Sequence, residues 1–213
     1  PIENPSYGYW APCARKVNDH LYRMYYCIVV NNYIKTGGRT YDGSWTERAF
    51  IGVMETSDPA SNNWEDKGFV ICSSSDKGTN WNRASEGDWN AYFKFNAIDP
   101  SFIITPEGEH WLIYGSWHSG IAAVQLNPET GKTLAELPKS YGTAAEIAPY
   151  GKLIFTRTNG GRWQGAEAPE IVYHDGYYYL FLAYDGLDIP YNTRVLRSTK
   201  VDGPYETLNG AVT

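Results

Sequence analysis

The feature that most constrains this chain is a pattern that occurs three times: a proline, an apolar segment, a tight turn and an aromatic-rich segment. It begins at "WAPC" (10–13), "IDPS" (98–101) and "EAPE" (167–170). The turns "PEGE" and "HDGY" have the Gly-containing composition of β-hairpins. Repeats of about four antiparallel strands are typical of propeller blades. The sequence therefore predicts an all-β chain folded as a β-propeller.

Short runs rich in Val, Ile, Tyr and Phe alternate with Gly, Asn, Asp and Pro clusters, as expected for antiparallel strands. Long helical periodicity is missing. The candidate strands are residues 21–30, 49–57, 68–74, 101–105, 110–117, 121–127, 170–175, 177–185 and 193–200.

We assign all 213 residues to one partial propeller domain, with blades at about 1–90, 91–145 and 146–213. Residues 31–45 and 73–95 are predicted to be long loops. Complete propellers have about four to eight blades. Blades that close the ring are therefore expected outside this chain, from another segment or another polypeptide.

Composition excludes several classes of partner. The net charge is −6 and Lys and Arg do not cluster, which argues against nucleic acid and anionic membranes. No run approaches the ~18 apolar residues of a membrane span, and the first residues do not resemble a signal peptide. Cys13, Cys27 and Cys72 have no metal-binding spacing and are expected to be buried free thiols.

Two acidic residues stand beside the repeated prolines. Asp99 directly precedes Pro100, and Glu167 lies just before Pro169. A residue before proline favours an extended conformation, so we expect both acids at matched ends of channel-lining strands, facing one cavity. The small, partly apolar neighbours of Glu167 favour its protonated form. The alternative is that these acids only begin strands or cap turns.

A larger set of motifs resembles family forty-three of the glycoside hydrolases, and most closely its endo-α-1,5-L-arabinanases. In order, they read "WAPC", "NAIDPS", "YGSWHSGI", "EAPEI", "GYYYLFLAYDG", "YNTRVLRS" and "GPY". The resemblance covers nearly the whole chain. It implies a five-bladed propeller, with about three blades present here, that hydrolyses α-1,5-linked arabinan with inversion.

The resemblance also assigns residues to roles. Glu167 matches the general acid, and Asp99 matches a second Asp that modulates the pKa of the acid and orients it. Four residues match positions in the substrate cleft, and a further Trp could stack on a sugar ring. The candidate substrate-binding residues are Asn96, Ser116, Trp117, Arg194 and Trp10.

The chain departs from the family pattern at two points. The family's general base is an Asp in an HDP-like motif, which these residues lack, so the base is expected outside this chain. An inverting enzyme needs a base about 6.5–9.5 Å from the acid, and the activity of this chain alone is therefore left open. "WAPC" also places Cys13 where the family usually has Asp, which is expected to alter a hydrogen bond.

The resemblance implies plant cell-wall arabinan or its oligosaccharides as the partner, and hence a secreted or periplasmic location. No cofactor or metal site is predicted in this chain, although family members often hold calcium or another metal at the propeller centre. Alternative functions are a β-xylosidase or exo-α-L-arabinofuranosidase of the same family, or a non-catalytic arabinan-binding propeller.

Overall fold

A computed structural model describes most of the chain. The described residues are 7–30, 48–73, 95–117, 120–137, 150–157, 165–186 and 190–212. The predicted loop 31–45 and nearly all of 73–95 lie outside them. No helix within the described ranges is long and apolar enough to cross a membrane.

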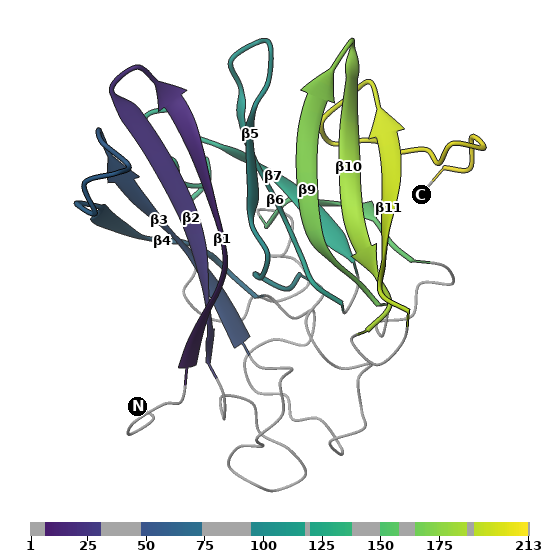
Figure 1. Ribbon diagram of the computed structural model, residues 1–213, viewed down its shortest axis with the longest axis horizontal. Coiled ribbons are helices and arrows are strands. Elements are labelled where there is room, and N and C mark those ends of the chain that lie inside the picture. The colour runs from purple at the N-terminus through teal and green to yellow at the C-terminus, as the bar shows by residue number, and fades with distance from the viewer. Residues whose placement is uncertain are drawn as a thin grey trace, which may run out of the picture.

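The described strands form three antiparallel sheets (Figure 1). The first sheet has the order β1 (Tyr7–Asn18), β2 (Leu21–Val30), β3 (Arg48–Thr56) and β4 (Glu65–Cys72). The second has the order β5 (Ser101–Ile104), β6 (His110–Tyr114), β7 (Ile121–Leu126) and β8 (Lys152–Phe155). The third consists of β9 (Ala166–His174), β10 (Tyr177–Tyr184) and β11 (Asn192–Ser198), with β10 in the middle.

The predicted strands are confirmed to within a few residues, and β2 agrees at both ends. Two strands were not predicted. β1 contains a proline and is mostly exposed, so it lacks a clear apolar alternation. β8 has only four residues, yet it pairs with β7 and extends the second sheet beyond the blade boundary placed at about residue 145. The division into blades otherwise stays a prediction.

The two hairpin turns follow from their sequences. Between β9 and β10, Asp175 has φ 46° and Gly176 has φ 85°. Two successive left-handed residues match the twist of the strands on either side, and Asp-Gly adopts this conformation readily. Between β5 and β6, Gly108 has φ 85°. Both turns lie at the same end of the sheets (Figure 1).

The first strand of each sheet lies next to that of the following sheet. β5 contacts both β1 and β9, as seen in the centre of Figure 1. The Cys13 sulfur accepts a hydrogen bond from the Phe102 amide at 3.4 Å, and Ser101 Oγ accepts one from the Ile171 amide at 3.2 Å. The same bond therefore recurs between successive sheets, with a thiol in one place and a hydroxyl in the other.

Apolar side chains from facing sheets form two clusters. One lies between the first and second sheets and includes Tyr25 and Phe102, whose ring centroids are 5.0 Å apart. The other lies between the second and third sheets and includes Ile113 and Leu180. All three cysteines are buried and free, as predicted.

A buried guanidinium ties the first sheet to the second. Arg23 on β2 is fully buried, and its Nε donates to Glu55 Oε1 at 2.7 Å. Its Nη1 and Nη2 donate to the carbonyl oxygens of Pro128 and Glu129, at 2.8 and 2.7 Å. These carbonyls belong to the turn that follows β7, so one side chain satisfies polar groups from both sheets.

We expect Arg23→Leu to lower the free energy of unfolding by about 3–5 kcal/mol, because the Glu55 carboxylate would lose its buried partner. Urea denaturation measures the difference. The control is Arg197→Leu, which breaks the half-exposed pair with Glu206 and should cost less than about 1 kcal/mol. Equal losses in the two variants would contradict this assignment.

Candidate functional site

The residue before each repeated proline has an unusual backbone conformation. Ala11 has φ 39°, Asp99 has φ 54° and Ala168 has φ 51°. The expectation of an extended residue before proline was therefore wrong. Register shifts fall beside Ala11 in the β1–β2 pair and opposite Ala168 in the β9–β10 pair. Bulges of this kind change the direction of a side chain at the end of a strand.

The shared conformation also corrects the expected match between the two acids. Asp99 corresponds to Ala168, since each is the left-handed residue before a proline. Glu167 stands one residue earlier and corresponds to Ile98 and Trp10. The two acids are nonetheless brought together, because Asp99 Oδ2 accepts a hydrogen bond from the Ala168 amide at 2.9 Å.

The half-buried Glu167 carboxylate accepts three hydrogen bonds. Ser116 Oγ donates to Oε2 at 3.2 Å and Trp117 Nε1 donates to the same oxygen at 2.9 Å. The Tyr191 hydroxyl contacts Oε1. Glu167 therefore lies among polar donors, rather than in the partly apolar setting expected from its sequence neighbours.

The backbone at the end of β6 positions two of these donors. The Trp117 amide donates to the Ala166 carbonyl oxygen at 2.9 Å, which ties this segment to the start of β9. The φ of Trp117 is 54°, a left-handed value that a tryptophan seldom adopts. Trp117 was expected to stack on a sugar ring, which stays a prediction. In the structure its indole nitrogen donates a hydrogen bond to Glu167.

Asp99 lies in an environment that perturbs its ionisation. Its pKa is raised to about 6, mainly by burial; the hydrogen bond from the Ala168 amide partly offsets this rise, and the nearby charge of Glu167 adds to it. Burial dominates because an ionised carboxylate loses hydration in the interior. Asp99 can therefore change its charge within the weakly acidic pH range.

Asn96 supports the site from behind. Its side chain is buried, Nδ2 donates to the Ser116 carbonyl oxygen at 2.7 Å, and Oδ1 accepts from Ser73 Oγ at 3.0 Å. Ser73 Oγ also accepts from the Ala49 and Ala97 amides. Asn96 was expected to contact substrate, and in the structure it holds the segment that carries Ser116.

Arg194 lies over an aromatic ring on β10. Its guanidinium carbon is 5.6 Å from the Tyr184 ring centroid, and that of Arg157 is 4.6 Å from the same ring. Arg157 Nη1 also pairs with Asp185 Oδ1 at 2.5 Å. Two cations therefore flank one tyrosine beside the start of β11.

Trp10 occupies the position in the first repeat that Glu167 occupies in the third. Its side chain is 36% exposed, so one part of the ring system can meet a ligand. Its carbonyl oxygen accepts a hydrogen bond from the Cys27 sulfur at 3.0 Å, next to the register shift in β1. This contact holds the backbone of Trp10 against β2.

Tyr191 was not among the predicted site residues. It opens the "YNTRV" motif, of which only Arg194 was selected. Nothing in the local pattern indicates a contact with Glu167, 24 positions away. The signal available was its place in that motif.

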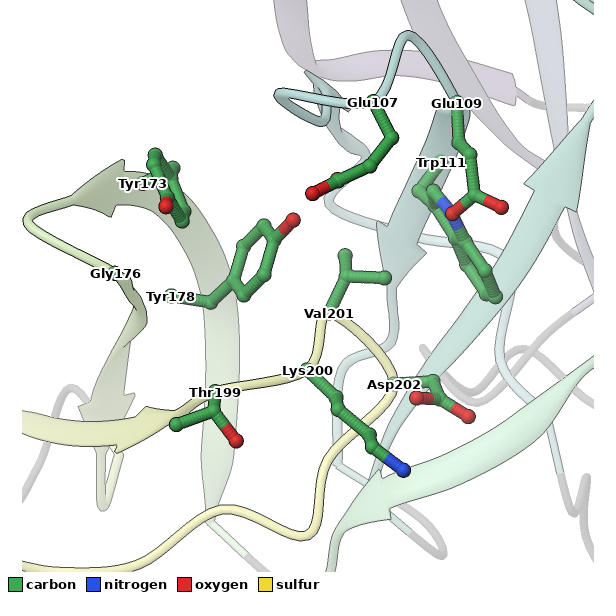
Figure 2. A pocket seen from close by; sticks show the side chains of 10 residues that line it. All are labelled: Glu107, Glu109, Trp111, Tyr173, Gly176, Tyr178, Thr199, Lys200, Val201 and Asp202. Carbon is green, nitrogen blue, oxygen red and sulfur yellow. The ribbon is translucent and has the colours of Figure 1, made fainter.

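A cavity of about 380 Å³ lies at the hairpin end of the second and third sheets (Figure 2). Figure 2 shows Glu107, Glu109 and Tyr178 around it, with Lys200 on the opposite side. Glu167 is near the first residue of β9 and the cavity is near its last. The cavity is therefore separate from the pair of acids.

The described residues include candidate ligands for a metal ion, but they do not cluster. Within those ranges, no group of three His, Cys, Asp or Glu residues could hold a metal ion. Glu170 on the inner strand β9 already pairs with Arg15 and accepts a hydrogen bond from Ser101 Oγ at 2.9 Å. A guanidinium at this carboxylate leaves it poorly suited to a cation.

Comparison with known proteins gives one consistent result. The model of the family described as glycosyl hydrolases family 43 matches residues 2–212. An extracellular endo-α-(1→5)-L-arabinanase of Thermotoga petrophila is 32% identical over 94% of this chain and 37% of the relative. An extracellular exo-α-(1→5)-L-arabinofuranosidase of Cellvibrio japonicus is 31% identical over 94% and 50%. The chain thus spans at most half the length of these two curated relatives.

Solved structures agree. A family 43 endo-arabinanase from Bacillus licheniformis has a TM-score of 0.63 at 30% identity, covering 96% of this chain and 56% of that one. The endo-1,5-α-L-arabinanase of Thermotoga petrophila has a TM-score of 0.67 at 29% identity, covering 96% and 40%. The predicted all-β propeller class is confirmed.

The pKa of Asp99 predicts a pH-dependent stability. The folded protein holds this proton more tightly than an unfolded chain with the ordinary value of 3.8, so ionisation costs stability as pH rises from about 4 to about 6. Asp99→Asn avoids this cost, and its carbonyl oxygen can still accept from Ala168. We expect the variant to be more stable than the wild type at pH 8, by up to about 3 kcal/mol, and to match it near pH 4.

Urea denaturation at several pH values measures this gap. The control is Leu208→Ala, which changes an exposed apolar side chain and removes no ionisable group, so its difference from the wild type should be the same at every pH. A constant difference between Asp99→Asn and the wild type from pH 4 to pH 8 would show that Asp99 does not hold its proton as described.

Proposed function

The chain belongs to family 43 of the glycosyl hydrolases, and on that premise we propose that it carries the acid half of a glycosidase active site. Glu167 is the general acid and Asp99 its modulating neighbour. The observation that carries this proposal is the pair of acids joined through the Ala168 amide, with one carboxylate held by three donors. Such an arrangement fixes a carboxyl group in one orientation, as proton delivery requires.

In this proposal, Glu167 gives its proton to the glycosidic oxygen as the bond from that oxygen to the anomeric carbon breaks. A second carboxylate activates the water that attacks the opposite face of the sugar. That base is expected outside the residues of this chain. Without it, hydrolysis should fall by a factor of about 10²–10⁴.

Asp99 acts on Glu167 through charge and position. Its carboxylate binds the amide directly after Glu167, so it fixes the backbone that carries the acid. When Asp99 is ionised, its negative charge opposes a second negative charge on Glu167 and favours the acid in its neutral form. The same residue therefore orients the acid and helps to keep it protonated.

We propose α-1,5-linked arabinan as the substrate, since endo-arabinanases and an exo-arabinofuranosidase are among the relatives. Several of these relatives are named extracellular, which supports a secreted location. The flanking cations at Tyr184 and the exposed part of Trp10 would meet the hydroxyls and faces of the sugars. An exo-acting enzyme or a β-xylosidase would use the same general acid, but its loops would close one end of the substrate cleft differently.

The test is anomeric NMR of linear arabinan with the longest natural polypeptide that contains these residues. We expect products that first appear with inverted anomeric configuration. Glu167→Gln should lower kcat by about 10²–10⁴, because the amide cannot protonate the leaving oxygen. Its affinity for arabino-oligosaccharides should stay within about threefold, because the amide keeps the size of the side chain.

The matched control is Glu107→Gln, an exposed acid in the β5–β6 turn, which should leave kcat unchanged. Retained configuration would contradict the inverting mechanism. An active Glu167→Gln variant would contradict the assignment of the acid. Binding of arabinan without hydrolysis by the wild type would favour the non-catalytic alternative.

A further inference from the structure

The two oxygens of the Glu167 carboxyl group have different kinds of neighbour. Oε2 accepts from Trp117 Nε1 at 2.9 Å and from Ser116 Oγ at 3.2 Å. Oε1 is in contact with the Tyr191 hydroxyl. An indole N–H can only donate, whereas a phenolic hydroxyl can donate or accept. The two oxygens are therefore not equivalent when the group carries a proton.

The position of the acid proton follows from these neighbours. A neutral carboxyl group donates through one oxygen and keeps the other as its acceptor. Because Trp117 can only donate, Oε2 stays the acceptor and the proton belongs on Oε1. Tyr191 then accepts from Oε1 in the neutral state and donates to it in the ionised state. Burial and the hydrogen bond to Glu167 raise the pKa of Tyr191, so its hydroxyl keeps its own proton.

The neighbours also differ in how firmly they are held. Ser116 is buried, and Trp117 is tied to β9 through its backbone amide. Tyr191 is 44% exposed and directly precedes β11. The contacts at Oε2 thus belong to packed sheets, while the contact at Oε1 lies at the surface, where a ligand can reach it.

We propose that Tyr191 is a positioning residue, whose hydroxyl marks Oε1 as the proton-bearing oxygen and stays beside it during the reaction. The inference rests on the proposed function. When substrate binds, the Oε1–H group turns from the Tyr191 hydroxyl to the glycosidic oxygen, and Tyr191 then donates its own hydrogen bond to Oε1. The Oε1–H bond breaks and its proton goes to the glycosidic oxygen, whose bond to the anomeric carbon breaks. Water supplies the new hydroxyl, its other proton goes to the external carboxylate base, and Glu167 is left ionised.

The test is Tyr191→Phe in the same natural polypeptide, with two substrates that differ in their need for acid catalysis. Cleavage of an arabino-oligosaccharide releases a sugar alcohol, which is a poor leaving group unless it is protonated. Cleavage of a 4-nitrophenyl glycoside releases a phenolate, which needs little protonation. We expect kcat for the oligosaccharide to fall about tenfold, because the acid is less well oriented. KM should not rise, and kcat for the aryl substrate should change by less than about twofold.

Tyr173→Phe is the matched control, because Tyr173 is 42% exposed and lies at the far end of β9. Equal losses on both substrates, or a higher KM with unchanged kcat, would overturn the role of Tyr191. Unchanged kinetics on both substrates would overturn it as well. An inactive wild type would instead overturn the proposed function itself.

The contact can also be tested without any activity. In a sample with ¹³C-labelled glutamate carboxyl groups, Glu167→Gln identifies the Glu167 signal. We expect this signal to shift in Tyr191→Phe and to stay in place in Tyr173→Phe. A signal that is the same in the wild type and in Tyr191→Phe would show that the hydroxyl does not bind Oε1, and would overturn the proposal.

Discussion

The site depends on hydrogen bonds from one inner strand to the next. Asp99 accepts from the Ala168 amide, while Ser101, two residues further along, accepts from the Ile171 amide. These bonds hold β5 against β9 on either side of a proline. The start of β9, and with it Glu167, therefore has its position only when the second and third sheets are docked. The position of Glu167 therefore depends on contacts from both sheets.

Behind the acids, a second series of contacts extends inward. Ser73 binds backbone amides and Asn96, Asn96 binds the carbonyl oxygen of Ser116, and Ser116 binds Glu167. Asn96 and Ser116 are buried, so each hydrogen bond is stronger than it would be in water, and costly to leave unmade. Hydrogen bonds thus connect the first sheet to Glu167 on the third sheet through residues of the second sheet. Asn96 and Ser116 also hold each other in place, and their predicted contact with substrate stays a prediction.

The sequence was a good guide to strands and a poorer guide to the backbone at the site. β2 was predicted at both ends because Val, Ile and Tyr are dense there, whereas the mostly exposed β1 carries no such signal. Asp99 was expected to be extended because a residue before proline prefers an extended conformation. This preference depends only on the local sequence. The hydrogen bond to Ala168 comes from a different sheet, and a local rule contains no information about it. The contact of Tyr191 with Glu167 involves a single sheet, but it joins residues 24 positions apart, so the local pattern contained no information about it either.

The left-handed residues before the three prolines also limit how this family member can vary. Glycine adopts such a φ at no cost, asparagine and aspartate adopt it more readily than other residues, alanine does so at some cost, and the β-branched residues Val, Ile and Thr are the least suited to it. Ala11 and Ala168 are therefore under the same restriction as Asp99, although neither presents an acid. A saturation library would be depleted of β-branched residues at all three positions alike. The small set of residues that residue 99 can accept therefore reflects its backbone conformation as much as the chemistry of its side chain.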